Sequence, residues 1–271
     1  MGVNHGIAVA FLSVGILAAG GAPTLRVVAA PPVVPPTNHL PANCENEQDA
    51  ACFYYVDGEQ AAVATGASVS ITQADPAVGP NDQHALAEMA IESADGQQIV
   101  EVGWIVAEGV NGDSLPHLFT YHWVKGGATC YNLGCGFVPS SGAKVPTGGK
   151  VMIDKTGTFK MAYAKGRWVV TYDGSEVGYF PESLWTNAGV RFTKAALVQV
   201  FGEVAGSEIT DPTTQMGNGT FGSTPASAVF NAFTLLGSST KPNLYVYDTA
   251  PTWYDFGQPS KVGFHFGGPG A

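Results

Sequence analysis

Basic residues are scarce in this chain: 12 Lys and Arg stand against 22 Asp and Glu in 271 residues, giving a formal net charge of −10 at pH 7. A protein that binds nucleic acid through its phosphates needs a surplus of Lys and Arg, so the charge balance argues against that partner. Charged residues of either sign make up only 13% of the chain. Few ion pairs are therefore lost when carboxylates become protonated, which is compatible with work in acid.

Hydrophobic runs long enough to span a membrane are absent as well. The apolar run Ile7–Ala18 is too short to cross a bilayer comfortably, and we expect no membrane span elsewhere. Small residues follow this run at Ala19–Ala22, although the usual Lys or Arg before it is missing. We expect residues 1–22 to be a signal peptide and the protein to be secreted.

The next stretch is rich in proline. Residues 31–36 contain four prolines, which cannot continue a helix or a central strand, so residues 23–43 are predicted to be an extended linker. We expect the folded domain to cover residues 44–271. No glycine pattern of the dinucleotide-binding or phosphate-binding type occurs in the chain, and no internal repeat.

Short apolar, β-branched and aromatic runs recur along the chain, separated by Gly, Pro, Asn and Asp. Without long helical periods between them, they predict an all-β fold, an antiparallel β-sandwich of two sheets. Asp173-Gly174 is a hairpin turn signal, and one helical turn is expected at Pro181–Trp185. The predicted strands are Ala62–Ile71, Ala85–Ile91, Ile99–Val106, His117–Val124, Phe137–Val138, Lys150–Ile153, Thr158–Ala164, Arg167–Tyr172, Glu176–Tyr179, Ala195–Val204, Ala228–Leu235, Asn243–Tyr247 and Val262–Phe266.

Four cysteines fit an exported protein with two disulfides. Their spacing favours local pairs, Cys44 with Cys52 and Cys130 with Cys135. A zinc site is the competing interpretation, but the arrangement of His and Cys is poor for it.

Two histidines are also unsuited to a shared metal. His117 and His122 have opposite strand parity, so we expect neither a metal nor a cofactor. Asp113, four residues before His117, is expected to cap a turn.

Glu101 lies within one of the most apolar stretches, Ile99–Val106. Side chains alternate between the two faces of a strand, so Glu101 shares a face with Ile105 while Val100 and Trp104 take the other. Because burying an unpaired carboxylate is costly, such a group is neutralised, paired or used chemically. The alternative is a polar position on an edge strand.

Glu203 repeats this pattern in Ala196–Val204, where it shares a face with Gln199 and Phe201. Two carboxylates placed close together across a cleft can share one proton, because like charges at contact distance resist ionising together. One then acts as base and the other as acid. Glu101 and Glu203 are therefore the predicted catalytic pair.

Several longer blocks occur in a specific order. They are Val102-Gly-Trp-Ile-Val106, Gly112-Asp-Ser-Leu-Pro-His-Leu-Phe-Thr-Tyr121, Thr129-Cys-Tyr-Asn-Leu-Gly-Cys-Gly-Phe-Val138, Val177-Gly-Tyr-Phe-Pro-Glu-Ser-Leu184, Phe201-Gly-Glu-Val204, Thr214-Gln-Met-Gly-Asn-Gly219 and Gly267-Gly-Pro-Gly270. In this order the chain resembles the neprosin family of glutamic peptidases, from about Gly66 to the C-terminus.

This resemblance implies a β-sandwich in which Glu101 and Glu203 do the chemistry, and it places the family's cysteine pair at Cys130 and Cys135. Family members cut peptides next to proline in acid, so it also implies a proline-containing peptide or protein as substrate. We expect a monomer. One departure is Phe201, which stands where the plant-like pattern has Gly and would narrow the cleft or raise a carboxyl pKa by desolvation.

Further residues are candidates for binding substrate. Gln199 shares the face of Glu203 and would orient the attacking water, and Gln215 belongs to one of the blocks. Aromatic rings near these strands would stack on proline or pack in the core; they are Trp104, Tyr121, Trp123 and Trp185.

Two other function classes remain open at this stage. A glycoside hydrolase also uses two carboxylates on a β-sandwich, and it would degrade a polysaccharide but no peptide. A non-catalytic carbohydrate-binding or cell-wall-binding module would keep the sandwich and tolerate loss of both glutamates.

Overall fold

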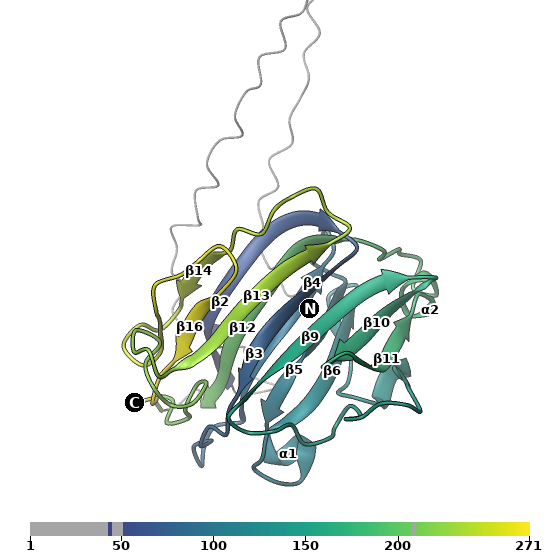
Figure 1. Ribbon diagram of the computed structural model, residues 1–271. Helices are drawn as coiled ribbons and strands as arrows, with labels where there is room; N and C mark the ends of the chain where they lie inside the picture. Colours follow the sequence, from purple (N-terminus) through teal and green to yellow (C-terminus); the bar gives the residue numbers. More distant parts are fainter. Residues whose placement is uncertain (1–42, 45–50, 208–209) are drawn as a thin grey trace, which may run out of the picture.

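The computed structural model describes residues 43–44, 51–207 and 210–271, and they fold into two stacked antiparallel sheets (Figure 1). The first sheet contains, in order, β1 (Asn43–Cys44), β2 (Ala51–Ala64), β12 (Ala195–Ser207), β4 (His84–Glu92), β5 (Ile99–Val106), β6 (His117–Val124) and β7 (Gly127–Ala128), and β14 (Tyr245–Asp248) pairs with β2. The predicted signal peptide and nearly all of the predicted linker lie outside the described residues.

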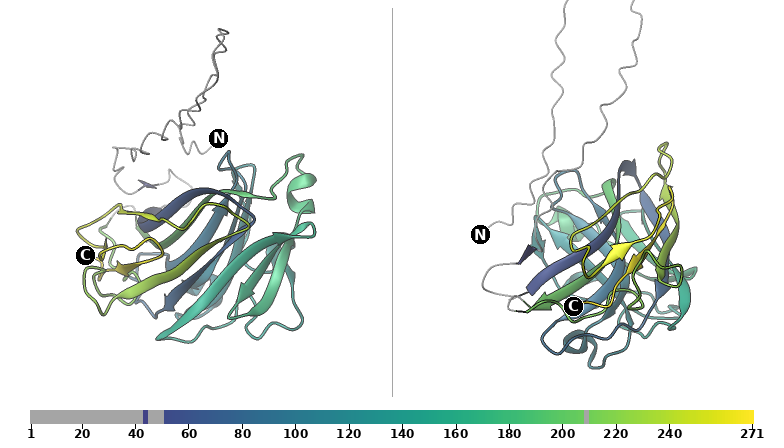
Figure 2. Two further views of the ribbon diagram at one scale, coloured as in Figure 1. Left: turned by 45° about the horizontal axis from the view of Figure 1, so that its top comes forward. Right: turned by 90° about the vertical axis from the view of Figure 1, so that its left-hand side faces the viewer.

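The second sheet covers one face of the first. It contains, in order, β15 (Asp255–Phe256), β16 (Phe264–Gly267), β13 (Ala228–Leu236), β3 (Gly66–Gln73), β9 (Lys155–Ala164), β10 (Arg167–Tyr172), β11 (Ser175–Pro181) and β8 (Val138–Pro139). Figure 2 shows the same two layers from two other sides. The predicted all-β sandwich of two antiparallel sheets is confirmed.

Helical structure is limited to short turns. α1 (Glu108–Asn111), η1 (Gly134–Gly136) and α2 (Ser183–Thr186) each have three or four residues. In the part of the chain that the structure describes, no helix is long and apolar enough to cross a membrane. α2 confirms the helical turn expected near Pro181.

The core lies between the sheets and is built from the inward side of each strand. Trp104, Trp168 and Phe230 are fully buried there. Gly202 of β12 leaves room for a ring of the second sheet, because a Cβ at this position would lie 2.6 Å from Phe266. The glycine beside Glu203 therefore fixes the spacing of the sheets at this point.

Several strand predictions hold in detail and others are wrong. β5, β6 and β10 have the predicted bounds. The predicted strand 62–71 is divided at Thr65 between β2 and β3, which belong to different sheets; the apolar pattern continues through this bend, so it gives no signal there. The predicted strand 150–153 is absent: only Lys150 forms an isolated bridge, and Met152 is 65% exposed in a turn.

Local turn predictions are confirmed. Asp173 and Gly174 have φ of 45° and 73° and join β10 to β11 as a tight hairpin. Asp113 accepts a hydrogen bond from the backbone N–H of Leu115, two residues on, at 3.0 Å. This closes the expected turn.

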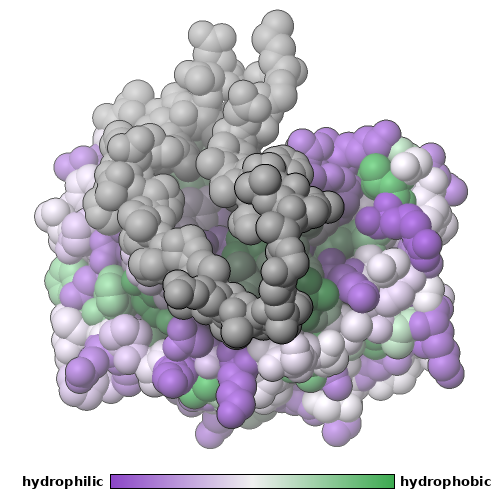
Figure 3. All heavy atoms as spheres, turned by 90° about the horizontal axis from the view of Figure 1, so that it is seen from above, coloured by the Kyte–Doolittle hydropathy of each residue, from purple (hydrophilic) through white to green (hydrophobic). Residues whose placement is uncertain are grey.

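Among the described residues, the exposed large hydrophobic side chains come from separate elements. Seen from above, the described part of the surface shows small hydrophobic patches among hydrophilic residues (Figure 3). The most exposed large apolar side chains, Val63 and Met152, come from different elements, β2 and the turn before β9. Scattered apolar residues of this kind are ordinary on protein surfaces.

Candidate active site

Glu101 and Glu203 lie on the same face of the first sheet, the face turned away from the second sheet. Glu101 projects from β5, whose other face, with Val100 and Val102, is buried in the core. Strand β4 runs between β5 and β12, with Ala90 opposite Glu101 and Leu86 opposite Glu203. The two predicted carboxylates therefore flank one strand on the face turned away from the second sheet.

A third carboxyl group lies between them. Glu88 projects from β4 on this face, opposite Gly103 of β5 and Phe201 of β12, and is only 3% exposed. Glu88 is a diagonal neighbour of both glutamates, and such neighbours on adjacent strands have Cα atoms about 7–8 Å apart. Sequence reasoning missed Glu88, although the signal that indicated Glu101, a lone carboxylate in an apolar strand, is also present in Ala85–Ile91.

Burial sets the charge state of Glu101. Loss of water raises its pKa to about 8, the indole of Trp123 partly opposes this, and the negative charge of Glu203 adds to it. Trp123 Nε1 donates a hydrogen bond to Glu101 Oε1 at 2.7 Å. Glu101 is therefore a protonated, oriented carboxylic acid from acid to neutral pH.

Glu203 has a different partner. Its Oε1 lies 2.7 Å from Nε2 of His84, and the two side chains are only 12% and 11% exposed. His84 begins β4 and faces the same side, opposite Ala205 of β12. Glu203 is thus paired with an imidazole and Glu101 with an indole, so the surroundings of the two carboxyl groups differ in kind. No sequence signal had identified His84.

Tyr131 leans over this face from the loop closed by the Cys130–Cys135 disulfide. Its ring centroid lies 4.7 Å from that of Tyr121. Burial, followed by the charges of Glu203, Glu101 and Glu88, raises the pKa of its phenol far above the ordinary value. The hydroxyl therefore stays neutral, near all three carboxyl groups. The predicted Cys130–Cys135 pairing is confirmed.

The second predicted disulfide is only partly described. The backbone of Cys44 in β1 lies opposite that of Cys52 in β2. This register is compatible with the expected bond, but the side chain of Cys44 lies outside the described part of the structure. The Cys44–Cys52 pairing stays a prediction.

A further buried carboxyl occupies the β2 side of the same face. Asp57 is 3% exposed; burial and the nearby charge of Glu59 raise its pKa well above the usual value. Gln199 Nε2 donates to Asp57 Oδ2 at 2.7 Å, and the Tyr247 hydroxyl donates to the same oxygen at 3.0 Å. Gln199 shares the face of Glu203 as predicted, but its amide is bound to Asp57.

The other predicted binding residues separate into two groups. Tyr121 lies opposite Glu101 on β6, with its ring 5.9 Å from that of Trp123, so both aromatics border the site. Of the two roles considered for Trp104, the structure shows core packing, and its prediction as a substrate-binding candidate is wrong. Trp104 has the opposite strand parity and is fully buried, and its Nε1 donates to Thr72 O at 3.0 Å. Trp185 is likewise a core residue.

The hydrogen bonds of Gln215 are made to Ala77 and not to either glutamate. The side-chain Oε1 of Gln215 accepts from the backbone N–H of Ala77 at 3.0 Å, and the backbone N–H of Gln215 donates to Ala77 O. These contacts join the loop after β12 to the loop after β3. The substrate-binding role of Gln215 stays a prediction without a contact to support it.

Metal ligation finds no support in the described ranges, where no group of three His, Cys, Asp or Glu side chains is arranged to hold an ion. His117 is bound to Asp113 and to Gly148 O. His122 lies on the core face, and burial lowers its pKa to about 4.

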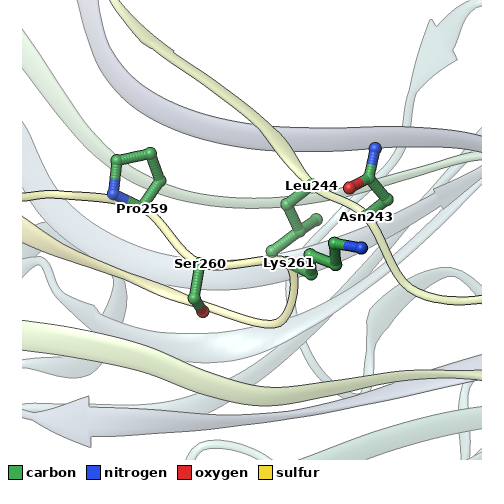
Figure 4. Close-up of a pocket in the computed structure, with 5 residues that line it drawn as sticks. All are labelled: Asn243, Leu244, Pro259, Ser260 and Lys261. Carbon is green, nitrogen blue, oxygen red and sulfur yellow. The ribbon is translucent and has the colours of Figure 1, made fainter.

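A shallow pocket elsewhere is lined by Asn243, Leu244, Pro259, Ser260 and Lys261 (Figure 4). It lies beside the segments that lead into β14 and β16. No carboxyl group lines it, so it offers none of the chemistry of the glutamate face.

Comparison with known proteins identifies the fold. Scytalido-glutamic peptidase, solved with a transition-state analogue inhibitor, matches with a TM-score of 0.50 and 8% identity over 81% of this chain and 99% of that chain. SCP-B, a member of the Eqolisin family of peptidases, matches with a TM-score of 0.45 and 7% identity, over 81% of this chain and 99% of that chain. The carbohydrate-binding module CBM66 from Bacillus subtilis matches with a TM-score of 0.31 and 11% identity, over 59% of this chain and 81% of that chain.

The two-sheet sandwich is thus similar in fold to scytalido-glutamic peptidase. A family model described as Neprosin matches residues 81–269 of the chain. The chain belongs to the Neprosin family.

Proposed function

We propose that this protein is a secreted glutamic endopeptidase that hydrolyses peptide bonds next to proline, in acid, through Glu101 and Glu203. The observation that carries the proposal is the position of two carboxyl groups with unlike partners on one face of the first sheet, in a member of the Neprosin family. The Cys130–Cys135 disulfide suits an oxidising compartment, which supports the proposed secretion through residues 1–22.

The two glutamates take different roles. Glu203, paired with His84 at 2.7 Å, is the ionised base that removes a proton from water as the water oxygen bonds to the scissile carbon. Glu101, with its pKa raised to about 8, is the acid that protonates the leaving nitrogen as the C–N bond breaks. The Tyr131 hydroxyl donates to the oxyanion that develops on the carbonyl oxygen.

The pH dependence follows from these roles. Activity requires a protonated Glu101, so it falls as the pH rises through about 8. In acid Glu101 stays protonated, so activity is retained there.

The aromatic border suits a proline side chain. Tyr121 and Trp123 lie beside Glu101, and the Tyr131 ring lies over Tyr121. A rigid apolar pyrrolidine ring packs well against such faces without losing side-chain entropy. This arrangement supports the proposed preference for proline next to the scissile bond.

The test is digestion of a proline-rich peptide library from acid to neutral pH, read by mass spectrometry. Wild type should cut next to proline, while E101Q and E203Q should each lose about 10³-fold or more in kcat, since each removes a group that transfers a proton. E176Q, at an exposed glutamate of β11, is the matched control and should retain full activity. Near-normal turnover in both site variants would refute the assignment.

A further inference from the structure

The resting protonation state must be restored after each proposed turnover. Hydrolysis starts with Glu203 ionised and Glu101 protonated, and it ends with the water proton on Glu203 and with Glu101 having given its proton to the amine. Glu203 must therefore lose one proton, and Glu101 must gain one, before the next cycle. The two residues lie on strands separated by β4, so a direct carboxyl-to-carboxyl transfer would have to cross that strand.

Glu88 occupies the intervening position. On β4 it is the diagonal neighbour of Glu203 on one side and of Glu101 on the other. Gly103, directly opposite on β5, has no side chain: a Cβ there would lie 2.6 Å from Glu88 Cβ. Glu88 thus packs directly against the backbone of Gly103, and a side chain at position 103 would clash with it.

The Glu88 carboxyl is also buried. The residue is 3% exposed, and among the described residues no hydrogen bond to its carboxyl is present. A carboxyl group that is buried from solvent but makes no hydrogen bond to a described residue does not stabilise the fold through such a bond. A role in proton exchange explains its position better.

We propose that Glu88 relays the proton from Glu203 to Glu101 between turnovers. Glu88 passes its own proton to the ionised Glu101 and accepts one from the protonated Glu203, so that no bond other than O–H is made or broken and no net charge changes. Burial and the charges of Glu101, Glu203 and Asp57 raise its pKa well above the usual value, which leaves it protonated and ready to donate. This role rests on the proposed peptidase function.

Several titratable groups face Glu88, and each can affect how the rate of turnover depends on pH. They are Glu101 from β5, Glu203 from β12, Asp57 from β2 and Tyr131 from the disulfide loop. On β4 itself, His84 and Glu92 share its face. Glu92 is also a glutamate, and it lies on the same strand and the same face as Glu88. Burial raises the pKa of Glu92 to about 7, so Glu92 is the matched control.

Rapid-mixing kinetics with a peptide that wild type cleaves would test the relay. In E88Q the first turnover starts with the other protons in place and should stay fast, whereas the steady-state rate should fall about 100-fold, the usual size of a proton-transfer contribution. A burst of one product per enzyme molecule should therefore appear. E88D, which keeps an exchangeable proton, should recover part of the steady rate, and E92Q should match wild type without a burst.

The outcomes separate the relay from the proposed function. If wild type cleaves no peptide, the peptidase proposal fails. If wild type cleaves and E88Q keeps the wild-type steady rate at every pH, the relay is refuted. It is also refuted if E88Q slows the first and later turnovers equally, since that pattern indicates a structural role, or if E92Q shows a burst of the same size.

Discussion

Replacing Glu101 by Gln is expected to inactivate the enzyme and to stabilise it above acid pH. Glu101 has a pKa of about 8 in the folded protein and 4.5 as a reference. The folded protein therefore holds a proton that the unfolded chain has lost, and the stability from this group is full below about pH 4.5 and lost as the pH rises through about 8. Gln is neutral throughout and can accept the same hydrogen bond from Trp123, so E101Q escapes this loss.

The magnitude follows from linkage. Between pH 4 and pH 7 the raised pKa lowers the free energy of unfolding of wild type by about 3 kcal/mol, which corresponds to about 6–12 °C in Tm for a domain of this size. E101Q should match wild type near pH 4 and exceed it by about this amount near pH 7. The charge of Glu101 also helps to raise the pKa of Glu88. Because E101Q removes this charge, it removes a repulsion on the Glu88 carboxylate and further favours the folded variant at neutral pH.

Thermal unfolding of both proteins, followed by circular dichroism at several pH values, measures this difference. E176Q serves as the exposed control and should follow wild type at every pH. If the Tm of E101Q and of wild type fall in parallel as the pH rises, Glu101 is not held protonated by burial, and its proposed role as the acid loses its basis.

Two further predictions concern the loop above the site. Y131F should lower kcat about 10-fold or more with little change in KM, because the hydroxyl is proposed to stabilise charge that exists only in the transition state; an unchanged kcat would exclude that donor. A C130S/C135S double variant should lose about 2 kcal/mol of stability, as expected for the closure of a short loop, and should lower kcat as Y131F does because Tyr131 is no longer held. Urea unfolding and peptide kinetics on the same samples measure both effects, and full kcat in the double variant would show that the disulfide does not position the ring.

Local sequence pattern determined much of the fold and half of the site. Alternation in Ile99–Val106 and Ala196–Val204 already placed Glu101 and Glu203 away from the core, because side-chain direction in a strand depends only on parity. Parity also explains the error at Trp104: it lies three residues from Glu101 and so faces the core, whereas Trp123 belongs to a different strand and reaches Glu101 across the sheet.

Only the tertiary structure decided which strand lies between the two glutamates. That order, with β4 between β12 and β5, depends on the pairing of β4 with β12, which lies more than a hundred residues further along the chain, and no local propensity encodes such register. This register places Glu88 diagonal to both glutamates and places His84 within 2.7 Å of Glu203. The sequence alone thus determined the face of each carboxylate, while long-range strand pairing determined its neighbours, and with them its charge.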